Sequence, residues 1–152
     1  MSINTTTPMT VKYPSTGLTA QKNAALEVLK HTAMLCESLR QNFIDYSIRR
    51  HEFMMPSSDN PTYHEEAIAK LQDGICDYDF TFHTGRKYHK VIMTAHGSRS
   101  VHAFIDKNTG DVYKSASFKA PAAGVRYNLM DTASRELCFQ RCDWSGGYLY
   151  LR

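Results

Sequence analysis

The sequence lacks several features that would assign it to a familiar class of protein. No run of about 18 apolar residues occurs, so we expect no segment that crosses a membrane. The first residues also lack the basic stretch and apolar block of an export signal. From these two absences we expect a protein that acts in the cytoplasm.

Motifs for nucleotide binding and catalysis are missing as well. The glycines form neither G-x-G-x-x-G nor a phosphate-binding loop, and G-x-S-x-G and H-E-x-x-H do not occur. The cysteines are scattered along the chain, and the closest two are spaced as C-x-x-x-C without a second pair, unlike zinc ligands. We therefore expect reduced thiols, no metal, no cofactor and no enzymatic activity.

Size and composition are those of one folded domain. The chain has 152 residues, of which 42% are hydrophobic and 22% are charged. We expect a single domain over residues 1–152, in which residues 1–17, rich in Thr, Ser and Pro, form a flexible or loosely docked arm. Net charge is +3 and is concentrated in residues 76–152, which hold eleven Lys and Arg against seven Asp and Glu. This mild excess permits contact with phosphates or with an acidic partner.

The first half of the chain is typical of helices. Residues 18–50 contain no proline or glycine, and apolar residues recur there at spacings of three and four. This pattern predicts one amphipathic helix, capped by Thr19 and about 45 Å long. Thr62 and Glu65 have the spacing of a capping box, so a second, short helix is predicted from Thr62 to a C-terminal Gly74.

After Gly74 the apolar residues alternate with polar ones, which is typical of strands. Three turn-like breaks, HTGR, HGSR and KNTG, separate four short strands. We therefore predict an α+β fold, in which the long N-terminal helix packs on one face of an antiparallel β-meander of four to five strands. In the tail we predict a helix over residues 132–140 and a last strand in GGYLYLR.

The strand register can be predicted by counting outward from the turns. If the second turn is Gly97-Ser98, Val91 lies opposite Phe104, and His89 lies opposite Asp106. The core face would then hold seven apolar and aromatic side chains: Tyr78, Phe80, Phe82, Val91, Met93, Phe104 and Tyr113. A bulge would exchange the two faces beyond it.

The predicted helix is longer than the sheet that it covers. Strands of this length span about 20–27 Å, so an apolar end of the helix would extend past the sheet and need another surface. A second copy of the chain is the simplest partner, and we expect a homodimer formed through the long N-terminal helix.

The outer sheet face could bind nucleic acid. The register places five basic or aromatic residues on it: Arg86, Tyr88, Lys90, Arg99 and Lys114. Their cations could follow a phosphate backbone while the tyrosine stacks on a base. The alternative is an ordinary solvated face, because Asp77 and Asp79 on the first strand weaken the positive field.

His89 and Asp106 are the candidate pair for chemistry. A carboxylate can orient an imidazole as a general base, but no nucleophile accompanies this pair at a defined spacing. The alternative is a structural cross-strand pair. The other histidines of this region are spread over both faces, which argues against a metal site: His83, His96 and His102.

One segment resembles a known group of proteins. Residues Val101–Leu129, with a T-G-D turn that runs into Lys-Ala-Pro, are similar to a segment of small uncharacterised bacteriophage proteins, marine phages in particular. The resemblance implies a viral origin and a bacterial host cytoplasm, and it implies no activity. We therefore expect a non-catalytic accessory protein that binds a host or viral macromolecule. Nucleic-acid binding through the outer face is the alternative, and an enzyme that uses His89 and Asp106 is the third possibility.

Overall fold

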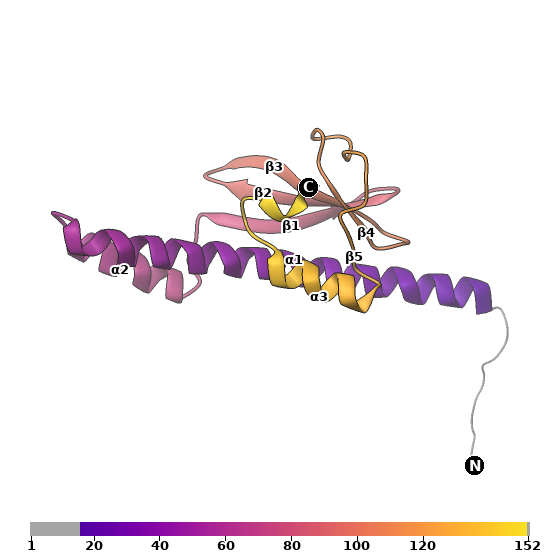
Figure 1. Cartoon of the computed structure of the whole chain (residues 1–152), viewed down its shortest axis with the longest axis horizontal. Coiled ribbons are helices and arrows are strands. Elements are labelled where there is room, and N and C mark those ends of the chain that lie inside the picture. Colours follow the sequence, from indigo (N-terminus) through magenta and orange to yellow (C-terminus); the bar gives the residue numbers. More distant parts are fainter. Residues whose placement is uncertain (1–15, 152) are drawn as a thin grey trace, which may run out of the picture.

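The computed structural model describes residues 16–151 and consists of a sheet with helices on one side (Figure 1). The helical elements are α1 (Thr16–Met54), η1 (Met55–Ser57), α2 (Pro61–Gln72), α3 (Thr132–Arg141) and η2 (Gly147–Leu149). The strands are β1 (Tyr78–Thr84), β2 (Tyr88–Ala95), β3 (Ser98–Asp106), β4 (Asp111–Lys114) and β5 (Tyr127–Asn128). They form one antiparallel sheet in the order β1-β2-β3-β4-β5, so the predicted α+β meander is confirmed.

Helix α1 is longer than the apolar pattern predicts. It has 39 residues rather than roughly 30, so at 1.5 Å per residue it is about 58 Å long instead of about 45 Å. It ends at Met54, and Pro56 follows inside the short η1 turn. Residues 16 and 17 of the predicted N-terminal arm belong to this helix, and the rest of that arm lies outside the described residues.

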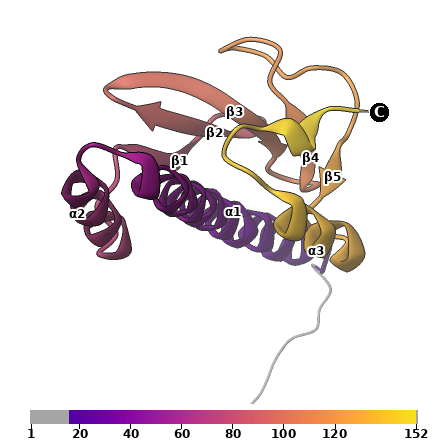
Figure 2. The same ribbon diagram turned by 60° about the vertical axis from the view of Figure 1, so that its left-hand side comes forward.

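Helix α2 lies beside the C-terminal part of α1 (Figures 1 and 2). Its N-cap is Asn60, whose side chain accepts a hydrogen bond from the Tyr63 amide, so the prediction of Thr62 as the cap was wrong by two residues. Pro61 at the first helical position presets the backbone for this earlier start. At the other end Gly74 has φ +82°, as predicted for the residue after the helix.

The register between β2 and β3 departs from the prediction at two places. The turn between β2 and β3 is His96-Gly97, with φ of 52° and 81°, instead of Gly97-Ser98. A bulge at His102 then shifts the register, so that Ile92 pairs with Val101 but Val91 pairs with Ala103. Predicted and observed faces agree up to this bulge and are exchanged after it.

The exchange changes which strand residues enter the core. Phe104 and Tyr113 pair with each other as predicted, but both point away from α1, so their placement in the core was wrong. Ala103, Ile105 and Val112 take their place and are fully buried. They pack with the buried side chains of β1, β2 and the helices: Val28, Leu35, Cys36, Leu39, Phe80, Val91, Cys138 and Leu149.

The C-terminal segment packs on the helix side of the sheet and contributes Cys138 and Leu149 to the core. Helix α3 confirms the predicted helix, but the predicted last strand is the 3₁₀ turn η2. The physical reason is Asp143, whose carboxylate accepts hydrogen bonds from the amides of Ser145, Gly146 and Tyr148. With Gly146 at φ +85°, these bonds fold the chain back on itself and prevent an extended strand.

Candidate functional site

The face of the sheet opposite α1 carries no helix within residues 16–151 (Figure 2). Aromatic and lysine side chains gather on it from three strands and two connections. We call this set the aromatic–lysine cluster: Lys87, Tyr88, Lys90, Phe104, Tyr113 and Phe118.

The aromatic rings of the cluster pack edge to face. The Tyr88 ring centroid lies 5.6 Å from that of Phe104 and 6.0 Å from that of Tyr113. Phe104 is only 2% exposed and forms the base of the cluster. Phe118, in the connection after β4, is 48% exposed and offers the most accessible ring of the cluster.

Two lysines lie on these rings. Lys87 Nζ is 5.4 Å from the centroid of Tyr88, and Lys90 Nζ is 4.7 Å from that of Phe118 and 5.6 Å from that of Phe104. Neither lysine forms an ion pair with a carboxylate in the described part of the chain. Their charges are therefore available to an anionic ligand.

The carboxylates nearest the cluster have other partners. Asp106 is buried, and its Oδ1 accepts hydrogen bonds from the amides of Asn108 and Thr109 in the following turn. Asp111 accepts a hydrogen bond of 2.8 Å from the side chain of Asn128. Burial, and then the charge of Asp111, raise the pKa of Tyr113, so its hydroxyl stays neutral at physiological pH.

The structure places four of the five predicted outer residues on or beside the open face. Tyr88 pairs with Asp106, Lys90 with Phe104 and Arg99 with Thr94, and Arg86 lies exposed in the β1–β2 connection. Lys114 was placed wrongly, because the bulge at His102 turns it to the helix side, where its Nζ lies 4.9 Å from the Tyr150 ring centroid. Counting from the turns missed Lys87, Phe104, Tyr113 and Phe118 as members of this face.

The predicted opposition of His89 and Asp106 was wrong. Ile105 lies opposite His89, and Tyr88 lies opposite Asp106. The His89 Nδ1 is 2.8 Å from the Thr84 hydroxyl, and its Nε2 is buried without a partner in the described residues. Burial, aided by the positive charge of Lys107, lowers the pKa of His89. The imidazole is therefore neutral and is not oriented by a carboxylate.

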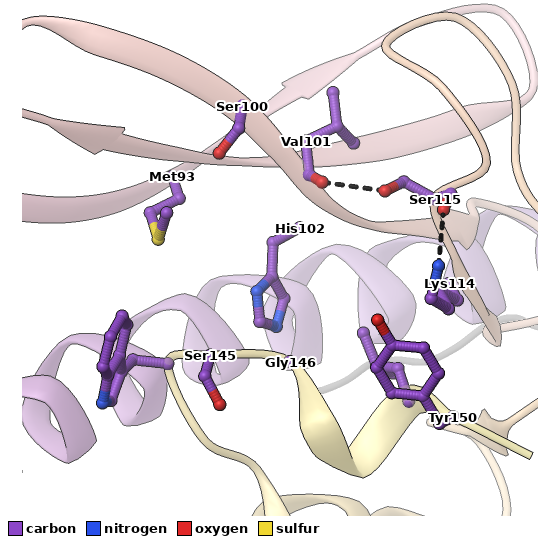
Figure 3. A pocket seen from close by; sticks show the side chains of 11 residues that line it. Met93, Ser100, Val101, His102, Lys114, Ser115, Ser145, Gly146 and Tyr150 are labelled. Atoms are coloured by element: carbon purple, nitrogen blue, oxygen red, sulfur yellow. Dashed lines mark hydrogen bonds between the residues drawn. The ribbon is translucent and has the colours of Figure 1, made fainter.

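A second candidate is a cavity of about 280 Å³ on the helix side of the sheet (Figure 3). His102 projects into it from the bulge of β3, toward the backbone at Gly146, and Lys114 and Tyr150 lie to one side. The His102 Nε2 lies 2.9 Å from the Tyr148 hydroxyl. Burial lowers the pKa of His102 to about 4, although the charge of Asp143 opposes the shift.

The polar groups around this cavity are largely engaged with the protein itself. The Ser115 hydroxyl donates to the Val101 carbonyl, and the Ser145 hydroxyl bonds to Asp143. Lys114 Nζ donates to the Ser115 carbonyl at 3.3 Å. The lining contains no carboxylate, so it suits a small neutral or anionic group better than a cation.

Histidines also meet between α1 and α2, where the Nδ1 atoms of His51 and His64 lie 2.9 Å apart. One ring must donate and the other accept, and burial together with His64 lowers the pKa of His51. Along residues 16–151, no three His, Cys, Asp or Glu side chains are placed to hold one metal ion. The same residues contain no helix long and apolar enough to cross a membrane.

Together these observations define a small α+β protein with helices on one side of its sheet and an aromatic, basic face on the other. The chain belongs to a family of unknown function, DUF7717, whose model matches residues 11–151. Searches of curated proteins and of solved structures gave no match.

Proposed function

We propose that this protein is a non-catalytic binding protein whose open sheet face binds single-stranded nucleic acid. The aromatic–lysine cluster carries the proposal, since it combines partly exposed rings with lysines that lack carboxylate partners. Bases stack on such rings irrespective of sequence, and lysines attract the phosphates between them.

The basic residues extend the surface beyond the cluster. Arg86 lies in the connection before β2 and Arg99 near the start of β3, so they flank the eight residues of β2 at its two ends. At about 3.4 Å per residue, the strand between them is about 27 Å long. The rings between them favour a flexible single strand over a rigid duplex, whose bases are already stacked.

The likeness of residues 101–129 to phage proteins supports a place of action in the cytoplasm of an infected bacterium. A host or viral protein is the other candidate for the ligand of this face. Nucleic acid is favoured because the two exposed ends of the face carry arginines and the cluster between them carries lysines.

The test is a titration of a fluorescently labelled single-stranded oligonucleotide, followed by anisotropy at several salt concentrations. We expect binding that weakens as salt rises, because protein cations release counterions from the phosphates. In the double variant Lys87→Ala/Lys90→Ala, the slope of log K against log salt should be shallower by about 1.4, since each phosphate contact on a single strand contributes about 0.7. Phe118→Ala should weaken binding about fivefold or more, because stacking of one base is worth about 1–3 kcal/mol.

The matched control is Arg49→Ala/Lys70→Ala, which removes two exposed cations from the helices instead of the sheet. This variant should bind like the wild type. No salt-dependent binding by the wild-type protein, or an equal loss in the control variant, would exclude nucleic acid as the ligand of this face.

A further inference from the structure

Helix α1 presents a stripe of exposed side chains along one of its sides. Lys22, Leu26, Leu29, Ala33 and Glu37 follow one another at spacings of three and four residues, so they lie on one side of the helix. All five are exposed, Leu26 to 62% and Leu29 to 37%. The middle of this stripe is apolar and exposed to solvent, whereas another side of the helix packs against the sheet. Such an exposed apolar stripe is typical of a surface that binds a partner.

The middle of the stripe borders a shallow groove. Leu26, Leu29 and Ala33 line it together with Phe82 of β1, the polar side chains of Asn23, Glu27 and Lys30 on α1 complete the lining, and its volume is about 800 Å³. Strand β1 is an edge of the sheet, so the groove opens to the side of the molecule.

Part of the β1 edge is closed to an additional strand. The Tyr78 amide donates to Cys76 Sγ, and the Phe80 amide donates to Asp79 Oδ1. With these N–H groups engaged, the groove is better suited to an apolar helix than to a pairing strand.

The order of charges along the stripe favours a second copy of this chain as the partner. Lys22 lies at one end of the apolar residues and Glu37 at the other, each four residues from its apolar neighbour. A second α1 that runs antiparallel about a two-fold axis places Lys22 against Glu37 of the partner subunit, and Leu26 against Ala33 of the partner subunit. The axis repeats both contacts, as in any isologous dimer. A parallel arrangement in register would set like charges against each other.

We propose that two copies of this chain form an antiparallel dimer through the stripe from Lys22 to Glu37 on α1. The dimer requires no nucleic acid and stands apart from the function proposed for the opposite face of the sheet. Each helix end of the interface carries one ion pair, and the leucines fill the middle.

The experiment measures mass by sedimentation equilibrium over a wide range of protein concentration. The wild-type chain should approach twice 17.3 kDa at high concentration and fall toward 17.3 kDa on dilution. Lys22→Glu and Glu37→Lys each set two like-charged pairs in the interface, so each should be a monomer over the same range. The double variant Lys22→Glu/Glu37→Lys restores opposite charges and should dimerise again.

Arg49→Glu is the matched control, since it reverses an exposed charge on the same helix outside the stripe, and it should dimerise like the wild type. Circular dichroism checks folding, and Lys and Glu have similar helix propensities. A wild-type chain that is a monomer at every concentration overturns the proposal. So does a dimer that Lys22→Glu leaves intact, or a double variant that stays monomeric while folded.

Discussion

Acid should weaken the fold through His102, whose partly buried imidazole lies at the β3 bulge. Burial lowers its pKa from the ordinary 6.5 to about 4. Between these two values the unfolded chain binds a proton that the folded chain does not. The contribution of His102 to stability is therefore complete above pH 6.5, and it is lost as the pH falls toward 4. Each pH unit of this interval is worth about 1.4 kcal/mol, so the loss amounts to about 3 kcal/mol.

Such a loss is a large part of the roughly 5–15 kcal/mol that stabilises a typical domain. The assay is urea unfolding at neutral pH and near pH 4, for the wild-type protein and for His102→Gln, which cannot titrate. Other histidines titrate in both proteins, so the difference between their pH profiles isolates His102. The wild-type protein should lose about 3 kcal/mol more than the variant. Parallel profiles, or an NMR titration of His102 with a midpoint near 6.5, would refute the reasoning.

Two further predictions concern the helices and the thiols. Asn60→Ala removes the side-chain cap of α2 and should lower the free energy of unfolding by about 1 kcal/mol. Hydrogen exchange should become faster in the first turn of α2 only. An unchanged stability would mean that Pro61 alone sets the start of the helix. Burial raises the pKa of Cys36 and Cys138 to about 12 and that of Cys142 to about 11. At pH 8 a thiol reagent should therefore label these three cysteines only after the chain unfolds, and it should label the one remaining cysteine of the folded chain rapidly. Rapid labelling of all four in the folded protein would contradict the buried thiols.

Local signals in the sequence predicted the elements of the fold well. The proline- and glycine-free stretch of α1, the glycine after α2 and the alternation after Gly74 each depend on neighbouring residues only, and each was confirmed. The helix within residues 132–140 was found for the same reason. The last strand was predicted wrongly, because the apolar and polar residues there alternate as in a strand. The Asp143 carboxylate instead accepts hydrogen bonds from three backbone amides and folds this segment into a turn.

The residues of the open face were harder to predict, because a bulge at a single residue determines which side chains of β3 and β4 lie on that face. His102 has no local signature of a bulge, and its side chain is held by Tyr148, which is 46 residues away in sequence. Beyond it every side chain changes face, so Lys114 was assigned to the open face while Phe104 and Tyr113 were assigned to the core. Residues before the bulge, such as Lys90, were placed correctly because the first two strands keep the predicted alternation.

The central claim is that the aromatic–lysine cluster is the binding surface of this protein. The most direct measurement is an NMR titration of the isotopically labelled chain with a single-stranded oligonucleotide. We predict shifts concentrated in Tyr88, Lys90, Tyr113 and Phe118, with α3 and the cavity at His102 unaffected. Shifts confined to the helix side of the sheet, or no shifts at any oligonucleotide concentration, would contradict the claim.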